Sequence, residues 1–286
     1  MFNVKYAVVE LLGGLGNQLH QICFAKYLKH IGYEVEISTN WFSENNFDDG
    51  TTKRKLELDV SKFGFNLVSH RKYRIFLIIE KIMNKKYLKR FYNSRYNLFF
   101  KTHTGNFFDD TFFINIFNGY WQDKNYLALT KDSFIEDIKT NNILYEKSIS
   151  DINPGNTMLH IRKGDYIKWG EDMDYEYYEK SLQLLNKYIK SIRYDIFTDD
   201  ANIDMSISLF KNANIIFNDL NQPALKILSD MSNYEHFIIS NSSLSYFSAL
   251  IGASESSLVI YPNPWFEKID YLPYVESNWI ESKNIS

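Results

Sequence analysis

The amino-acid sequence predicts an α/β protein of two Rossmann-like domains whose parallel sheets face a cleft. Short apolar runs rich in β-branched and aromatic residues recur along the chain, and helical patterns separate several of them. The chain has 286 residues, 45% of them hydrophobic. That is enough for one large core or for two domains of about 140 residues each.

Seven segments have the composition and length of buried strands. They span residues 4–12, 35–39, 157–161, 194–198, 214–217, 236–240 and 258–261. Between residues 175 and 192, apolar residues recur at steps of three and four, which places them on one face of a helix. They are Tyr178, Leu182, Leu185, Ile189 and Ile192. A polar stretch at 148–155 is the predicted boundary between domains 1–148 and 149–286.

Charge and composition narrow the class of protein. The 32 Lys and Arg against 35 Asp and Glu give a net charge of −3, which argues against a nucleic-acid-binding protein. The single Cys23 cannot form an internal disulfide, which favours a reducing compartment. No apolar run reaches the ~20 residues of a membrane span, and the first residues lack the pattern of a signal peptide. A cytoplasmic enzyme is therefore expected.

The segment 71–101 differs from the rest of the chain. It holds ten Lys and Arg against one acid, Glu80, with aromatic and aliphatic residues between them. This pattern is typical of a basic amphipathic helix that lies on an anionic membrane, here the inner face of the cytoplasmic membrane. An ordinary surface helix with a solvated basic face has the same pattern. Both interpretations stay open from the sequence.

A glycine-rich segment, LLGGLGNQLHQ at 11–21, follows the first predicted strand and opens a helix that extends to about His30. Glycines allow backbone N–H groups to approach an anion closely, and a helix N-terminus adds a positive dipole. Asn17 and Gln18 place amide donors at the helix start, where they can bind a phosphate or a sugar hydroxyl. The alternative is a plain turn between strand and helix.

A dinucleotide fingerprint is the rival interpretation of this loop. Gly14 and Gly16 fit its first two glycines, but Leu19 stands at the third position. A side chain there obstructs the close packing of helix on strand that glycine permits. A nucleotide-dependent oxidoreductase is therefore the less favoured function.

The segment MLHIRKGDYI at 158–167 predicts a buried strand that ends in a polar turn. His160 and Arg162 are two residues apart and so point to the same face of the strand. The planar guanidinium of Arg162 offers a fork of donors suited to a diphosphate. Asp165 is a candidate either to anchor that guanidinium or to act as a base. A purely structural Arg–Asp pair is the alternative.

Two acidic pairs are candidate ligand or metal residues. Asp199 and Asp200 end another predicted strand, where adjacent carboxylates can cap a helix, bind a ribose or hold a metal. Asp172 and Asp174 resemble the Asp-x-Asp pair with which some glycosyltransferases bind Mn²⁺ or Mg²⁺. Because that pair lies in a polar loop, we expect no metal site there.

A hydroxyl-rich turn follows the predicted strand at 236–240. The turn is Asn-Ser-Ser, and a helix with an apolar face comes after it. Ser242 or Ser243 is a sound N-cap, which needs no functional role. The functional alternative is a phosphate site, formed by hydroxyls and by the N–H groups of the helix start.

Together these segments resemble the bacterial α-1,2-fucosyltransferases of glycosyltransferase family 11. Six blocks in order carry the resemblance and cover most of the chain outside 64–118: GGLGNQLHQ at 13–21, KRKLELDVSKF at 53–63, GYWQDKNY at 119–126, HIRKGDY at 160–166, DYEYYEKS through IFTDD at 174–200, and MSNYEHFIISNSSLSYFSALIG at 231–252. The resemblance implies a GT-B-like fold, GDP-fucose as donor, inversion at the sugar carbon, no essential metal, and a glycan acceptor, the 2-hydroxyl of a galactose in an O-antigen or another surface glycan. A GT-B enzyme that uses another nucleotide sugar is the alternative.

The resemblance also implies roles for residues of this chain. Domain 1–148 would lie on the acceptor side, and domain 149–286 would bind the nucleotide sugar. The implied catalytic residues are Arg162, at the donor diphosphate, and Asn17. The implied donor-binding residues are Gly14 and Gly16 near the diphosphate and fucose, His160 near the nucleoside, and Ser242 and Ser243 at the phosphate oxygens. From the residues themselves we add Asp199 and Asp200 as donor-binding candidates. The candidates for the base that takes the acceptor proton are Asp165, or Glu171, Asp172 and Asp174 in the loop that follows it.

Four departures from the family pattern bear on which acceptor the chain uses and on how it recognises the nucleobase of the donor. His20 stands where the family usually has Phe, and Ser-Tyr-Phe at 245–247 replaces Ser-Trp-Trp. The loop after Asp165 is short and lacks the His that the family often carries there. Ile227 occupies a position that is usually acidic and that helps to recognise guanine.

Overall fold

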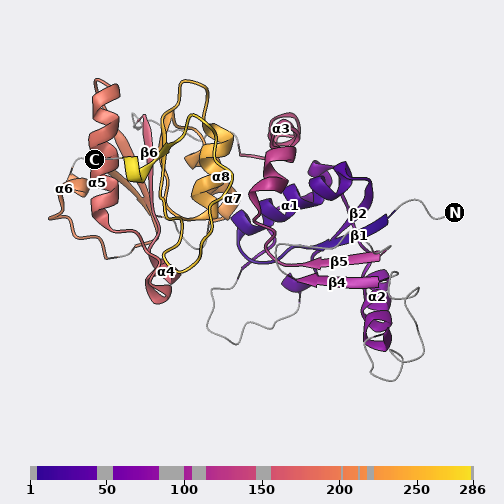
Figure 1. Ribbon diagram of the computed structural model, residues 1–286. Helices are drawn as coiled ribbons and strands as arrows, with labels where there is room; N and C mark the ends of the chain where they lie inside the picture. The colour runs from indigo at the N-terminus through magenta and orange to yellow at the C-terminus, as the bar shows by residue number, and fades with distance from the viewer. Residues whose placement is uncertain are drawn as a thin grey trace. The chain divides into compact units, whose positions relative to one another are not determined.

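The computed structural model describes residues 5–43, 54–83, 100–104, 114–145, 156–200, 202–211, 213–217 and 222–284, with the backbone alone at 79–83 and 100–104. The chain forms two compact units, Met1–Ile143 and Leu144–Ser286 (Figure 1). The predicted boundary after residue 148 falls in a segment outside the described residues. The roles predicted for the two domains stay predictions.

The N-terminal unit contains a parallel sheet with the strand order β3-β2-β1-β5-β4. Helices α1 and α3 lie on one face of this sheet, and α2 lies against the other (Figure 1). The strands are β1 (Lys5–Glu10), β2 (Tyr33–Ser38), β3 (Asn66–Leu67), β4 (Phe100–Thr104) and β5 (Ile114–Asn118), and the helices are α1 (Leu15–His30), α2 (His70–Met83) and α3 (Lys124–Thr140), with 3₁₀ turns at Asn40–Phe42 and Val60–Phe63.

The C-terminal unit contains a second parallel sheet, in the order β11-β10-β9-β6-β7-β8. Counted from its own first strand, this is the order of a Rossmann sheet. The strands are β6 (Thr157–Ile161), β7 (Tyr194–Thr198), β8 (Asn214–Phe217), β9 (His236–Ile238), β10 (Val259–Tyr261) and β11 (Ile280–Glu281), and the helices are α4 (Gly164–Trp169), α5 (Tyr175–Tyr188), α6 (Ser208–Lys211), α7 (Ala224–Met231) and α8 (Ser243–Gly252), with a 3₁₀ turn at Ser282–Asn284.

The predicted α/β class with two parallel-sheet units is confirmed. All seven segments predicted as strands are strands, and those at 157–161, 194–198 and 214–217 have the predicted bounds. The helix predicted to run to Ile192 instead ends at Tyr188, because Ile189 adopts an extended backbone with φ −115° and ψ 123°. Ile189 and Ile192 still pack on the same core, so the apolar residues continue to face it beyond the end of the helix.

Each unit buries its own core. In the C-terminal unit, Leu159, Ile196 and Ile238 come from three adjacent strands and pack beneath Tyr178 and Leu185 of α5, all fully buried. Alternate residues of a strand point to opposite faces, and both faces of a parallel sheet are covered by helices. The near-continuous apolar composition of these strands follows from that arrangement.

A stacked aromatic group lies at the centre of the N-terminal unit. Phe24 of α1 stacks on Trp121 with ring centroids 4.3 Å apart and an angle of 7° between the planes. Phe117 of β5 meets both rings edge-on. These contacts fix the chain that leaves β5 against the helix that follows β1.

Among the described residues, no helix is both long enough and apolar enough to cross a membrane.

Gly252 ends α8 where no side chain fits. A Cβ at this position would lie 2.3 Å from the backbone oxygen of Ser232, which ends α7, and 2.9 Å from the ring of Phe237. We expect Gly252→Ala to lower the free energy of unfolding by about 2 kcal/mol, since the two helices must move apart. Urea unfolding measures this, with Glu255→Ala in the exposed turn nearby as control. Equal urea midpoints for the two variants would show that α7 and α8 move apart without lowering the free energy of unfolding.

Candidate active site

The predicted site residues of the C-terminal unit gather where its strand order reverses. Arg162 directly follows β6, Asp199 follows β7, and the segment 240–242 follows β9. The order of strands changes direction between β6 and β9. In open parallel sheets, ligands bind outside the carboxyl ends of the strands at such a switch point. The topology therefore favours a ligand site at this edge.

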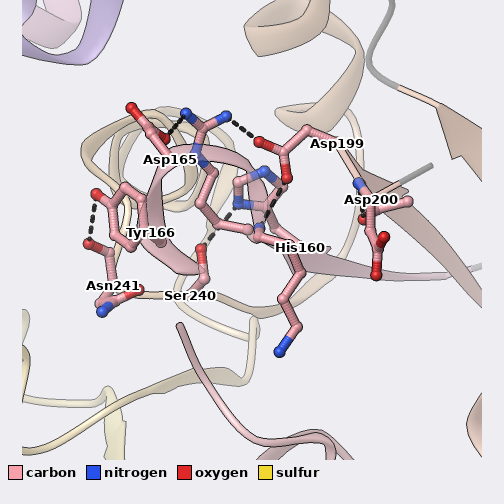
Figure 2. A network of polar contacts seen from close by, with 10 residues as sticks. His160, Asp165, Tyr166, Asp199, Asp200, Ser240 and Asn241 are labelled. Carbon is pink, nitrogen blue, oxygen red and sulfur yellow. Dashed lines mark hydrogen bonds and ion pairs between the residues drawn. The ribbon is translucent and has the colours of Figure 1, made fainter. Parts of the chain in front are cut away.

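Two carboxylates hold Arg162. Its Nη1 donates to Asp199 and its Nη2 to Asp165 (Figure 2). The backbone nitrogen of Lys163 also donates to Asp199, at 2.8 Å. A Cβ at Gly164 would lie 2.5 Å from the same carboxylate, so only glycine allows this approach. Local backbone geometry and the ion pairs therefore fix the guanidinium together.

The guanidinium keeps capacity to bind a ligand. Two of its five N–H donors are used by the carboxylates, and its side chain is 19% exposed. Of the two roles predicted for Asp165, the structure shows the anchor. One guanidinium between two carboxylates leaves a net charge of −1, so an incoming anion must bind the remaining N–H groups or displace a carboxylate.

His160 lies in the interior beside this ion pair. Its side chain is 1% exposed, its Nδ1 is 2.9 Å from the hydroxyl of Ser240, and Nε2 has no partner among the described residues. Burial first, and then the charge of Arg162, lower the pKa of His160 to about 3. The imidazole is therefore neutral at pH 7. A buried polar atom without a partner costs about 1–3 kcal/mol, which marks a position that packing alone does not explain.

Lys163 holds the loop that follows α4 in place, a role that the sequence did not predict. Its buried amine donates to Asp172 at 2.7 Å and to the backbone oxygen of Met173 at 2.9 Å, and it lies over the ring of Tyr175. Asp172 is thus an ion-pair partner, while Asp174 is the N-cap residue of α5. No group of three or more potential metal ligands occurs in the described part of the chain.

Glu171, which the sequence offered as a candidate base, is a second positioning residue in the structure. Its buried carboxylate accepts from the backbone nitrogens of Glu267 and Lys268, at 2.8 and 3.3 Å. Asn241 donates to its backbone oxygen at 2.7 Å, and Tyr166 of α4 donates to the backbone oxygen of Asn241 (Figure 2). Glu171 therefore connects the loop after α4 to the turn after β9 and to the segment after β10.

The remaining candidates of this unit lie at helix and turn starts. Asp200 accepts from the hydroxyl of Tyr175 at 3.2 Å and from the nitrogen of Asn202 at 2.8 Å, so it supports the turn after β7. Ser242 is the N-cap residue of α8, but its side chain makes no capping bond. Ser243 begins the helix and is half-buried.

The glycine loop of the N-terminal unit also lies at a switch point, between β1 and β5. Gly13 has φ +77°, and a Cβ there would lie 2.6 Å from the amide nitrogen of Asn17. Gly14 is the N-cap residue of α1, and Gly16 is buried in its first turn. The side-chain oxygen of Asn17 accepts from Gln122 at 2.8 Å.

Gln18 does not have the predicted role. Its side chain is fully buried, its Nε2 donates to the backbone oxygens of Gly13 and Lys55, at 3.1 and 2.9 Å, and its Oε1 accepts from the nitrogen of Glu57. The expectation that Gln18 offers its amide to a ligand is wrong. Because the loop backbone needs these partners in the interior, the amide is structural.

Residues 65–281 match the model of a family described as Glycosyl transferase family 11. The chain belongs to this family. An alpha-1,2-colitosyltransferase of Escherichia coli is 27% identical over 93% of this chain and 94% of its own. The O-antigen biosynthesis glycosyltransferase WbnK of Escherichia coli is 24% identical over 94% and 98%.

Solved structures resemble the chain more distantly. NodZ alpha-1,6-fucosyltransferase, in a crystal soaked with GDP-fucose, has a TM-score of 0.42 and 13% identity, over 87% of this chain and 93% of that one. A mutant of FUT1 from Arabidopsis thaliana, in complex with GDP, has a TM-score of 0.44 and 12% identity, over 87% and 69%.

The departures from the family 11 pattern are buried. His20 is 5% exposed, and burial lowers its pKa to about 3, so a neutral ring takes the place of the usual Phe. Tyr246 is fully buried against Trp265 and Trp279 and donates to the backbone of Tyr274. Ile227 is 9% exposed on α7, in the interior. All three departures therefore lie in the interior of their units.

The buried histidines predict a pH dependence of stability. The pKa of His160 is about 3 in the folded chain and about 6.5 when unfolded, so the unfolded chain binds more protons between these values. The contribution of the neutral buried histidine to the free energy of unfolding is complete above pH 6.5 and decreases as the pH falls towards 3. Each such histidine contributes about 1.4 kcal/mol per pH unit in that window.

We expect His160→Gln to flatten this slope between pH 6 and 4.5 by about 1.4 kcal/mol per unit, while His20 keeps its own contribution. Urea unfolding at several pH values measures it. His30→Gln, in the exposed last turn of α1, is the matched control for a histidine at the surface. A slope unaltered by His160→Gln would mean that the imidazole is protonated in the folded chain.

Proposed function

We propose that this chain transfers L-fucose from GDP-fucose, with inversion at the sugar carbon, to a hydroxyl of a surface glycan, the 2-hydroxyl of a galactose residue. The match to glycosyltransferase family 11 carries the proposal. The position of Arg162 at the switch point of a Rossmann-ordered sheet supports it. The family match also argues against the oxidoreductase alternative.

The proposed reaction breaks the bond between the sugar carbon and the donor diphosphate. The electron pair of that bond goes to the leaving GDP, the acceptor hydroxyl forms the new bond from the opposite face, and its proton passes to a base. Positive charge develops on the sugar and negative charge on the diphosphate. The guanidinium of Arg162 is preorganised by Asp165 and Asp199, so it can stabilise the leaving charge without rearranging first.

The same arrangement supports a reaction without an essential metal, which is part of this proposal. The N–H groups at the start of α8, ten residues long, add positive potential beside Ser242 and Ser243. The carboxylate of Asp172 is paired with Lys163, which leaves it poorly suited to bind a cation. Asp165 keeps its proposed catalytic role at the guanidinium of Arg162. Asn17 keeps its proposed catalytic role in the glycine loop.

Transfer of colitose is a second candidate, because one relative at 27% identity is an alpha-1,2-colitosyltransferase. Colitose is fucose without its 3-hydroxyl. A site that hydrogen-bonds this hydroxyl rejects the deoxy sugar strongly, whereas a site that leaves it in water does not distinguish the two. The comparison of the two donors therefore decides between the candidates.

We expect the chain to hydrolyse GDP-fucose slowly and to leave GDP-mannose and UDP-galactose unchanged. Release of nucleotide is measured with each donor, and with GDP-colitose, before and after treatment with EDTA. Rates with GDP-fucose should be equal in the two conditions, because the proposed charge stabilisation is supplied by the protein. Loss of activity on chelation with recovery in Mn²⁺ would overturn the metal-free reaction. Turnover of a UDP-sugar alone would overturn the donor.

Arg162→Lys should lower kcat/KM for GDP-fucose by about 100-fold or more. Lysine keeps the charge but presents a point in place of a planar fork, so it cannot bind two carboxylates and a diphosphate together. Arg193→Lys, on an exposed arginine just before β7, is the matched control and should change little. The dissociation constant for GDP and the melting temperature separate ligand binding from stability. A folded Arg162→Lys variant with normal GDP affinity and rate would make Arg162 structural.

A further inference from the structure

Helix α2 has an inner face that is fixed to the sheet. Tyr73 and Phe76 are 5% and 9% exposed and belong to the core on that side of the unit. The amine of Lys72 bonds Glu36 of β2 at 2.8 Å and lies over the ring of Tyr6, whose hydroxyl donates to the same carboxylate. The helix is therefore held rigidly, and the opposite face points away from the sheet (Figure 1).

The outer face combines cations with aliphatic side chains. Arg71 and Arg74 are exposed, and Ile75 and Ile78 are 46% and 51% exposed. At about 100° per residue these four positions fall within an arc of about 100° on the helix. Isoleucine on a water-facing stripe leaves apolar surface in water, whereas charged residues alone suffice for solubility. The paired isoleucines therefore need another explanation.

We propose that this basic–apolar face of α2 (Arg71, Arg74, Ile75 and Ile78) binds an anionic lipid surface. The guanidinium groups match lipid phosphates, while the isoleucines enter the boundary between headgroups and acyl chains. The sequence supports the charge complementarity, because ten cations and a single acid lie between residues 71 and 101. Since Lys72 is neutralised by Glu36 on the inner face, the outer face alone presents its positive charge to the lipid.

Lipid explains this face better than a protein or nucleic-acid partner does. A nucleic acid would use the arginines but not the isoleucines. A protein partner would be expected to cover a broader apolar patch than two side chains. An interfacial helix needs only a narrow apolar stripe bordered by Lys and Arg, and each cation adds attraction that salt weakens. This inference goes beyond the proposed function and does not depend on the donor.

Co-sedimentation of the full chain with vesicles tests the proposal. The wild type should pellet with vesicles of phosphatidylglycerol and phosphatidylcholine, and not with phosphatidylcholine alone. Binding should weaken from about 0.05 to about 0.5 M salt. Arg71→Gln with Arg74→Gln should lower the partition coefficient about fivefold for each arginine. Ile75→Ser with Ile78→Ser should lower it roughly tenfold and make the remaining binding more sensitive to salt.

Matched controls lie on α3 of the same unit. Lys124→Gln with Lys139→Gln removes two exposed cations, and Leu129→Ser removes an aliphatic side chain that is 60% exposed. Both should bind like the wild type. Circular dichroism and hydrolysis of the donor in solution should be unchanged in every variant, which separates lipid binding from folding and from sugar transfer.

Three outcomes would overturn the proposal. The first is equal binding of the wild type to neutral and anionic vesicles. The second is wild-type binding by both α2 variants. The third is an α2 variant that alters the oligomeric state in sedimentation velocity without altering vesicle binding, which would make the face a contact between copies of the chain.

Discussion

Reversal of strand order within a parallel sheet is the constraint on which the rest of this structure depends. Parallel strands end at one edge of the sheet, and the connections on the two sides of the reversal leave in opposite directions. In the C-terminal unit this separates the loop after β6 from the turn after β9, and in the N-terminal unit it separates the loops after β1 and β5. Polar side chains can occupy this edge without breaking the apolar core beneath it.

Hydrogen bonds of buried polar side chains then hold the loops at this edge of each sheet in place. In the N-terminal unit, Gln18 and Gln21 satisfy backbone groups of three separate segments, at 12–13, 55–57 and 119, which holds the glycine loop in place. In the C-terminal unit, Lys163 and Glu171 do the same for the loop after α4. Arg162 itself is held by Asp165 and Asp199, and such preorganisation is what stabilisation of a leaving group requires.

The departures of this chain from the family 11 pattern lie in its interior. A neutral buried His20 fills the place of an aromatic ring, and Tyr246 keeps a partner for its hydroxyl in the backbone of Tyr274. A buried polar atom costs little where it is hydrogen-bonded, as the hydroxyl of Tyr246 is. The departures lie in the core of each unit, whereas Arg162 and the glycine loop stay at the edges.

The sequence by itself determined the class of fold, seven strands, the glycine loop and the six ordered blocks of the family, because apolar periodicity and turn residues are local signals. It did not predict the strands β3, β4, β5 and β11, nor the end of α5 at Tyr188. Only the tertiary structure decided that Gln18 is structural, that Asp165 anchors Arg162 together with Asp199, and that Asp172 pairs with Lys163. The physical reason is that an amide, a carboxylate or an amine has the same donors and acceptors in any fold, and its partner is set by which segments the sheet brings together.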